Sequence, residues 1–225
     1  MPDKPDKLAV VAYDRIKRGI LSLEYQPGTV LQERALAGEL NMSRTPVREA
    51  VQRLAQQGWL KISARKCLNV REVNFDEMRQ TFQARSLLEL AVLEMLFTCG
   101  RTAEAAEQMK RLDGKMSQLE GQLFQFIVTD QMFHAVPFHV VGNKPLLRFW
   151  QTVSDEMIWY GMLAMTPFRY SDVLAEHGKV VEALRLGKVR LSRQSLQEHL
   201  NITEQMLVTN DVGGEDRGGC HELEV

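Results

Sequence analysis

The stretch Ser43-Arg44-Thr45-Pro46-Val47-Arg48-Glu49-Ala50 has the features of the start of a short helix. Ser43 is a favourable N-cap residue, because its hydroxyl can accept a hydrogen bond from a free amide of the first turn. Pro46 falls in that turn, where a missing N–H is tolerated. Arg44 and Arg48 are four residues apart and therefore share one helical face. The pair suits the groove of a nucleic acid, but a carboxylate-binding surface or a solvated charge pair explains the octapeptide equally well.

The residues around this stretch favour a small DNA-binding fold. Apolar residues follow a helical spacing in 8–22 and again in 33–40, and Asn41 suits the tight turn that leads to Ser43. The next helix is expected to end at Gly58, and residues 59–62 and 68–71 alternate like two short strands. Three helices and a β-hairpin make a winged helix-turn-helix, whose third helix presents its N-terminal end to a major groove.

The order of these motifs resembles the GntR family of bacterial transcription regulators over residues 8–73. The motifs are Pro27-Gly28-x-x-Leu31-x-Glu33-x-x-Leu36-Ala37, then Met42 with the octapeptide, then Leu54-x-x-x-Gly58-x-Leu60. The resemblance implies that Arg34 contacts phosphates or bases and that Arg44 and Arg48 read bases. It also implies that Ser43 and Thr45 contact phosphates. The expected wing tip, residues 64–67, departs from the family because it lacks a glycine.

Composition indicates an ordinary globular protein with two parts of opposite charge. Of the 225 residues, 44% are hydrophobic and 25% charged, and no run of about 18 apolar residues predicts a membrane span. Three scattered cysteines without a CxxC pair favour a reduced, cytoplasmic compartment, as does a polar N-terminus without a signal-peptide core. Residues 1–73 hold 13 basic and 8 acidic residues, whereas the remainder holds 15 and 21. This asymmetry predicts two domains with different partners.

The part after residue 73 is expected to be an all-helical domain, residues 74–210. Its apolar residues recur at threes and fours throughout, and the breaks between them predict six helices near residues 75–98, 102–117, 119–141, 145–165, 170–186 and 188–208. The fold class is therefore mainly α, with an N-terminal winged helix-turn-helix, residues 1–73, and a C-terminal six-helix bundle. Residues 211–225, with two Gly-Gly pairs and an excess of acids, are expected to form a disordered tail.

Four polar residues in the helical half form a candidate metal site. Asp130 and His134 are four residues apart and share one helical face, while His177 and His199 lie on the fifth and sixth expected helices of this half. One carboxylate and three imidazoles are a suitable ligand set for a divalent ion. The alternative for each histidine taken alone is a satisfied core or surface residue.

The same four residues resemble the metal motif of the FCD ligand domain, which follows the winged helix in the FadR-like branch of the GntR family. Six helices indicate its VanR-type subgroup. The resemblance implies zinc or nickel at the floor of a pocket for a small carboxylate. It further implies that Arg85, in the motif Arg85-x-x-Leu88-Glu89, pairs with that carboxylate; a surface ion pair between Arg85 and Glu89 is the alternative.

Three further residues are candidates for the effector pocket. Asn143 follows Gly142 in a pair that matches the same domain. Trp150 and Tyr160 belong to an apolar stripe that is most simply core, but their polar tips require partners and would suit a pocket wall.

These observations favour a bacterial transcription regulator. It would bind a pseudo-palindromic operator in double-stranded DNA as a homodimer, and a small organic acid would shift its DNA-binding equilibrium. One alternative is a metal sensor, in which the ion itself is the signal. Another is a metalloenzyme with metal-bound water as nucleophile. We expect no enzyme, because four protein ligands leave little open coordination and a winged helix would have no use.

Overall fold

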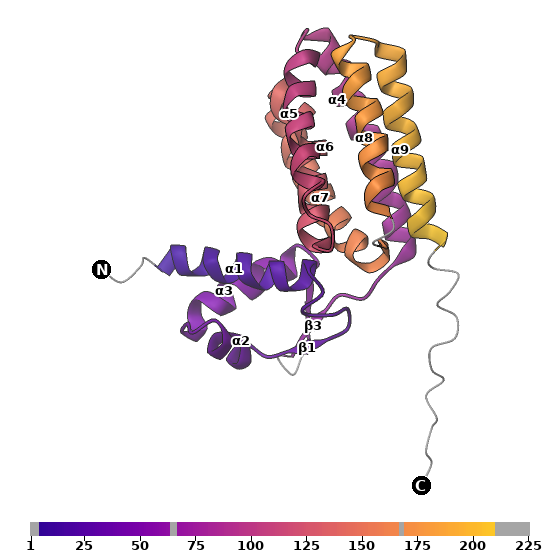
Figure 1. Ribbon diagram of the computed structural model, residues 1–225. Helices are drawn as coiled ribbons and strands as arrows, with labels where there is room; N and C mark the ends of the chain where they lie inside the picture. The colour runs from indigo at the N-terminus through magenta and orange to yellow at the C-terminus, as the bar shows by residue number, and fades with distance from the viewer. Residues whose placement is uncertain (1–4, 64–66, 167–168, 210–225) are drawn as a thin grey trace. The chain divides into compact units, whose positions relative to one another are not determined.

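The structure is a computed structural model that describes residues 5–63, 67–166 and 169–209. The chain forms two compact units that divide between Asn74 and Phe75, and the helices of both are drawn in Figure 1. The first unit contains α1 (Pro5–Leu21), β1 (Val30–Leu31), α2 (Glu33–Glu39), α3 (Arg44–Gln56), β2 (Leu60–Ile62) and β3 (Leu68–Val70). Residues 64–66 of the expected wing tip, 64–67, and the whole expected tail, residues 211–225, lie outside the described residues.

The first unit is the predicted winged helix-turn-helix. Its core is built where α3 packs on α1 and α2, and buried apolar side chains from all three helices fill it, among them Ile16, Ile20, Leu36, Val47, Val51 and Leu54. Asn41 joins α2 to α3 with a φ of 52°, a left-handed conformation that asparagine tolerates better than most residues. Gly58 follows α3 with a φ of 81°, which agrees with its predicted role at the helix end.

The sheet of this unit has one strand more than the sequence indicated. β3 lies between β2 and β1 and pairs antiparallel with both, so that Leu68 faces Ile62 on one side and Leu31 on the other. We expected Val30 and Leu31 to be only a lead-in to α2. A two-residue strand leaves no alternating pattern to recognise, and its pairing depends on β3, almost 40 residues further along.

The start of α3 differs from the sequence prediction in one respect. Ser43 occupies the N-cap position with extended backbone angles, but its side chain makes no capping hydrogen bond. The predicted hydroxyl cap is therefore wrong for this helix. Pro46 is buried in the first turn with Val47 behind it, so packing of the proline and the next apolar residue holds the helix start.

The second unit is a bundle of six helices within the described residues. They are α4 (Phe75–Thr98), α5 (Thr102–Met116), α6 (Leu123–Val141), α7 (Lys144–Ala164), α8 (Tyr170–Arg185) and α9 (Val189–Thr209). α4 packs against α6, α7 and α9, while α5 packs against α6 and α8. α6 begins at Leu123 and not near residue 119 as expected, because Gly121 adopts a φ of 77° that no helix continues through.

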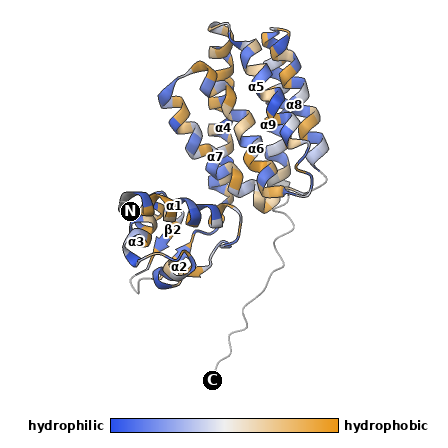
Figure 2. Cartoon of the chain, turned by 60° about the vertical axis from the view of Figure 1, so that its left-hand side comes forward, coloured by the Kyte–Doolittle hydropathy of each residue, from blue (hydrophilic) through white to orange (hydrophobic). Residues whose placement is uncertain are grey.

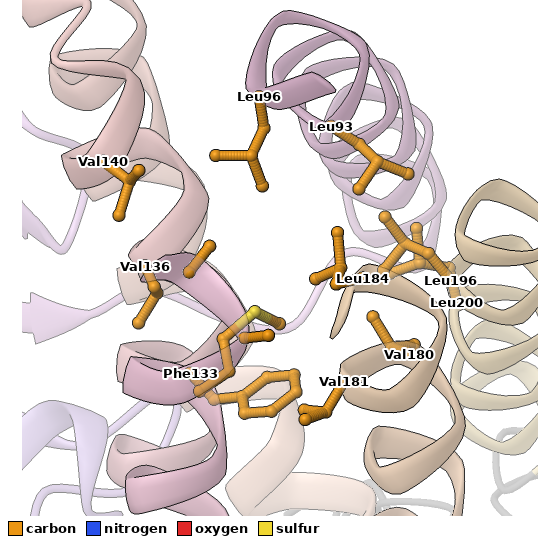
Figure 3. Packing of buried hydrophobic residues seen from close by; sticks show 13 residues of the cluster. Leu93, Leu96, Phe133, Val136, Val140, Val180, Val181, Leu184, Leu196 and Leu200 are labelled. Carbon is orange, nitrogen blue, oxygen red and sulfur yellow. The ribbon is translucent and has the colours of Figure 1, made fainter. Parts of the chain in front are cut away.

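Two apolar clusters lie along the bundle. The larger joins α4, α5, α6, α8 and α9 through residues such as Leu96, Phe133, Leu184 and Leu200, and Figure 3 shows these side chains meeting between the helices. The smaller contains Met116, Phe126, Tyr170 and Val173. Hydrophobic and hydrophilic residues alternate along the helices in Figure 2, as expected for amphipathic helices. Within the described residues, no helix combines the length and the apolar character that a membrane crossing needs.

Candidate metal centre and nucleic-acid interface

The four predicted metal ligands meet in the interior of the second unit. Asp130 and His134 project from adjacent turns of α6, His177 comes from α8 and His199 from α9. One ligand atom from each side chain lies within 4.8 Å of the other three, and the three imidazoles are at most 2% exposed. Asp130 and His177 lie along their helices between positions of the two apolar clusters, and His199 lies between Leu196 and Leu200 of the larger one. Helix packing therefore brings together polar groups that are far apart in the chain.

The distances between the ligand atoms suit one small ion. Nε2 of His199 lies 3.2 Å from Nε2 of His134, and Oδ1 of Asp130 lies 3.3 Å from Nε2 of His177. Two ligand atoms at about 2.0–2.1 Å from a tetrahedral zinc ion are themselves roughly 3.3 Å apart. These two pairs therefore already have the spacing of ligands on one ion, whereas Nε2 of His134 lies 3.9 Å from Oδ1 of Asp130 and the remaining pairs lie within 4.8 Å, so that binding an ion would draw the four groups closer together.

Each imidazole is oriented by a carboxylate at its other nitrogen. Glu89 Oε2 lies 2.7 Å from Nδ1 of His134, and Asp113 Oδ1 lies 3.0 Å from Nδ1 of His177. Oε2 of Glu176 lies 2.8 Å from Nδ1 of His199. A carboxylate at Nδ1 fixes the tautomer that leaves Nε2 free to bind a metal. All three rings thus present the same nitrogen to the centre.

Aromatic packing and charge keep these rings in a binding-competent state. The ring of His177 stacks on that of Phe133, with centroids 3.8 Å apart and planes at 4°. Burial lowers the pKa of His134 well below its usual value, and the nearby Arg85 guanidinium lowers it further. Burial also lowers the pKa of His199, against the opposing effect of Glu176. Both rings are therefore neutral near pH 7, as a metal ligand must be.

The carboxylates respond to the same surroundings in different ways. Burial opposes ionisation of Glu176, but hydrogen bonds from His199 and Arg169 outweigh it and lower its pKa to about 2. Burial raises the pKa of Glu89, although Arg85 partly offsets this. Burial likewise opposes ionisation of Asp130, yet the neighbouring histidines His134 and His177 lower its pKa overall.

A buried nitrogen without a protein partner is the strongest local sign that the cluster fits a metal. Nε2 of His177 is fully buried and makes no hydrogen bond to any described protein atom. A buried polar atom left without a partner costs about 1–3 kcal/mol. The nitrogen faces Asp130, on the side opposite the bond to Asp113. The donor set, three imidazoles and one carboxylate, fits zinc or nickel.

A small cavity that is partly open to solvent lies against this centre. Asp130 and His199 of the centre line this cavity, together with the two arginines Arg85 and Arg169. The remaining lining residues are the polar Gln131 and Thr203 and the apolar or small residues Phe82, Ile127, Met157, Gly161, Met165, Val173 and Met206. The Arg169 guanidinium is engaged at both ends by Glu176, with N–O distances of 2.7 and 2.9 Å. Arg85 differs, because its Nη2 has no hydrogen-bond partner among the described residues.

Arg85 combines the two roles that the sequence presented as alternatives. Its Nε donates to Oε1 of Glu89 at 2.7 Å, so the expected ion pair exists. The pair is not on the surface, however, because both side chains are at most 4% exposed. The opposite oxygen of Glu89 holds His134. Arg85 therefore touches the cavity on one side and, through Glu89, a ligand of the metal centre on the other.

The other three candidate pocket residues lie elsewhere in the second unit. Asn143 caps α7, where its Oδ1 accepts a hydrogen bond from the amide of Leu146 at 3.2 Å. Trp150 is buried and stacks on Phe138, and Tyr160 is buried beside Trp159. None of the three is among the residues that line the cavity. Of the four effector-binding candidates, the structure brings only Arg85 to the cavity.

The candidate nucleic-acid interface is the exposed end of α3 in the first unit. Arg44 and Arg48 extend from one face with side chains 64% and 54% exposed. Both lie near Oε2 of Glu33, at 3.9 Å and 3.3 Å. Such exposed ion pairs contribute about 0–1 kcal/mol. Glu33 therefore aligns the two guanidinium groups without holding them strongly.

The remaining predicted DNA contacts are also exposed. Ser43 and Thr45 lie at the start of α3, and Arg34 lies in the first turn of α2. In contrast, Val47, Ala50 and Leu54 face the core. The helix thus separates an apolar face that fixes it in the unit from a polar end that is free to meet a partner.

Sequence reasoning missed the residues that orient the functional groups. Glu33, Asp113 and Gln131 received no role, and Glu89 was considered only as a partner of Arg85. Glu89 and Asp113 lie 45 and 64 residues before the histidines that they hold, on different helices, so no spacing in the sequence identifies them. The one usable signal was Glu176, adjacent to His177, although it holds His199 on the next helix.

Two family profiles match the chain and together span most of it. The bacterial regulatory proteins of the gntR family match residues 8–70. The FCD domain matches residues 80–202, which is more than half of the chain. The first match covers α1 to β3, and the second covers the metal centre and the cavity.

Individual relatives align over nearly the whole length. The gluconate operon transcriptional repressor of Bacillus subtilis is 25% identical over 85% of this chain and 81% of its own. The probable D-xylose utilization operon transcriptional repressor of Paenarthrobacter nicotinovorans is 26% identical over 77% and 76%. Among solved structures, Escherichia coli McbR/YncC superposes with a TM-score of 0.77 over 91% of this chain and 98% of its own, at 22% identity. This last similarity supports the fold.

Proposed function

The chain belongs to the GntR family of bacterial regulatory proteins and carries an FCD domain, and from this premise we propose that a small carboxylate bound beside the metal centre controls its affinity for operator DNA. Membership of this family makes the chain a DNA-binding transcription regulator with a ligand domain. The proposal concerns what the ligand domain binds and how binding is transmitted.

The observation that carries the proposal is the unpaired Nη2 of Arg85 in the cavity wall. A guanidinium group pairs well with a carboxylate, and more strongly when both are buried. When bound by Asp130 and the three histidines, a divalent ion supplies a second positive charge beside the same cavity. An organic acid of a few carbon atoms is the ligand class that suits these charges and the apolar walls.

The proposed signal passes through contacts within the second unit. A carboxylate paired with Arg85 competes with Glu89 for the guanidinium, and Glu89 also orients His134. Binding therefore alters the helices that hold the metal centre, α4 and α6. A ligand shifts a conformational equilibrium only by its difference in affinity for the two states, so the acid must bind one arrangement of the protein more tightly.

On the DNA side, we propose that α3 enters the major groove, with Arg44 and Arg48 reading bases. Arg34, Ser43 and Thr45 would contact the backbone. A homodimer places two such helices about one turn of DNA apart on a pseudo-palindromic operator. Two relatives are named as repressors, and repression by blocking a promoter is the mode we propose for this chain. Assignment to the VanR-type subgroup stays a prediction.

The metalloenzyme alternative finds less support. Glu176, an acidic residue beside the centre that could serve as a general base, is occupied by Arg169 and His199, and its low pKa makes it a weak base. The relatives that cover most of the chain are named as transcriptional regulators.

The test is operator affinity in the presence of acids. Fragments bound by the chain are selected from genomic DNA, and their affinity for metal-loaded protein is measured by fluorescence anisotropy across a panel of short carboxylates. At least one acid should change the affinity by roughly 5- to 150-fold, the usual range of allosteric coupling. Arg85→Lys keeps a positive charge beside Glu89 but loses the planar guanidinium that can donate two parallel hydrogen bonds to a carboxylate. This variant should therefore show a smaller change of operator affinity with the acid.

Two results would contradict this account. An affinity unchanged across the panel would remove the carboxylate effector. A response to metal alone, equal with and without acids, would favour the metal sensor instead.

A further inference from the structure

Gln131 is buried beside the metal centre, and one end of its side chain has no partner. The residue follows Asp130 on α6, lines the cavity and is 4% exposed. Its Nε2 donates to Oδ2 of Asp130 at 2.7 Å. This contact fixes the orientation of the amide, because the reverse orientation would set its oxygen against a carboxylate oxygen. The amide oxygen, Oε1, is therefore left as an acceptor and makes no hydrogen bond to a described protein atom.

Two residues that line the cavity thus carry unsatisfied groups of opposite kind. Arg85 Nη2 is a charged donor, and Gln131 Oε1 is a neutral acceptor. A simple carboxylate can satisfy only the donor, because both of its oxygens are acceptors. A ligand that also carries a hydroxyl or amino group can satisfy both.

We propose that Gln131 is a specificity-determining residue, whose Oε1 selects acids that carry a hydrogen-bond donor near the carboxylate. The inference rests on the proposed carboxylate effector and narrows it to hydroxy or amino acids. A site built to bond a ligand hydroxyl discriminates strongly against the analogue without it, since its own polar group is then left unpaired. A keto group at the same carbon is also rejected, because it directs a second acceptor at Oε1.

Gln131 also acts as a positioning residue for the metal centre. Its amide holds one oxygen of Asp130, which leaves Oδ1 facing Nε2 of His177. Removing the side chain therefore affects metal binding as well as ligand choice. The ratio of affinities for two acids on the same protein separates these effects, because a change in metal affinity acts on both acids alike.

The experiment is isothermal titration calorimetry of the metal-loaded full chain with butanoate, 2-hydroxybutanoate, 3-hydroxybutanoate and 2-oxobutanoate. At least one hydroxy acid should bind about tenfold more tightly than butanoate, and the oxo acid no better than butanoate. In Gln131→Met, the side chain keeps its length but has no amide oxygen to accept a hydrogen bond. The ratio of the affinity for the preferred hydroxy acid to the affinity for butanoate should therefore fall to about one. Gln125→Met, the same change at an exposed glutamine of α6 that does not line the cavity, should keep the preference.

The outcomes separate this inference from the function on which it rests. Equal binding of butanoate and both hydroxy acids by the wild type, or an unchanged preference in Gln131→Met, overturns the role of Gln131 and leaves a carboxylate effector standing. If none of the four acids binds and no carboxylate changes the operator affinity, both the role of Gln131 and the carboxylate effector are overturned. The comparison of the four acids on the wild-type protein requires no variant, so it tests the inference even if Gln131→Met does not fold.

Discussion

The two units use charged and polar side chains in opposite ways. In the first unit, Arg44 and Arg48 are more than half exposed and only weakly tied to Glu33. In the second, His134 and His177 are at most 1% exposed, and each is held by a carboxylate. Exposed cations keep their hydration and remain available to a large polyanion. Buried ligands must be oriented in advance, because an unpaired polar group in the interior is costly.

The difference predicts where each unit is sensitive to substitution. Changes at α3 should alter partner binding and leave the fold intact, since the side chains involved carry little of the packing. Changes at the metal centre should affect metal binding, ligand binding and stability together, since its three histidines are buried among the packed helices. The predictions below test this contrast from the largest effect to the smallest.

The largest effect is expected from removing both guanidinium groups of α3. Arg44→Ala combined with Arg48→Ala should weaken specific operator binding by between about 30-fold and 10⁴-fold, because each bidentate base contact contributes about 1–3 kcal/mol. Arg53→Ala removes an equal charge at the other end of α3, where the guanidinium packs on Tyr13, and should change specificity far less. Anisotropy titrations against specific and scrambled DNA measure both. Wild-type discrimination in the double variant would contradict the proposed interface.

The next effect concerns a metal ligand. His177→Ala should lower metal affinity by more than about 100-fold, because even loss of an orienting group outside the ligand shell costs 10- to 100-fold. His139→Ala is the matched control, since His139 is an exposed histidine on α6. Competition with a chromophoric chelator gives the affinity, and circular dichroism checks the fold. Equal affinity in the two variants would show that the cluster is not the binding site.

A smaller loss is expected when an orienting carboxylate is removed. Asp113→Ala leaves Nδ1 of His177 without its acceptor and should lower metal affinity by roughly 10- to 100-fold. Glu94→Ala removes an exposed acid that pairs with Arg193 and should leave metal affinity unchanged. The same chelator competition applies. If Asp113→Ala bound metal as tightly as Glu94→Ala, carboxylate orientation would have no part in the centre.

The smallest effect compares one helix cap from each unit. Asn143→Ala removes a side chain that accepts a hydrogen bond at the start of α7 and should lower the free energy of unfolding by about 1 kcal/mol. Ser43→Ala should cost less than about 0.5 kcal/mol, because the Ser43 hydroxyl makes no capping bond. Calorimetry resolves the two units if they unfold separately. If Ser43→Ala lowered the free energy of unfolding as much as Asn143→Ala, the Ser43 hydroxyl would cap α3 in solution, which would contradict the structure.

Local pattern was enough to predict most of the fold. The spacing of apolar residues predicted the three helices of the first unit and the six of the second, because amphipathic periodicity is a property of neighbouring residues. The breaks were predicted where a glycine or proline prevents continuation, as at Gly58. Errors arose where structure depends on distant partners. β1 exists through its pairing with β3, and the cap at Ser43 depends on side-chain geometry that its residue type does not fix.

The candidate site was predictable only in part, for a related reason. Asp130 and His134 share a helix, so their spacing alone places them together, whereas His177 and His199 were grouped with them only as ligand-type residues on two other expected helices, and the resemblance to a family motif then supported the set. The groups that orient the ligands, Glu89 and Asp113, belong to other helices. Acidic residues are frequent in every helix, so only the packed structure distinguishes those two.

The central claim, that Asp130 and the three buried histidines bind a single ion, is tested most directly by X-ray absorption spectroscopy of the zinc-loaded protein. The account predicts one ion per chain, with nitrogen and oxygen ligands at about 2.0–2.1 Å and the scattering pattern of several imidazoles. Sulfur ligands at about 2.3 Å, or no zinc retained after desalting, would contradict it.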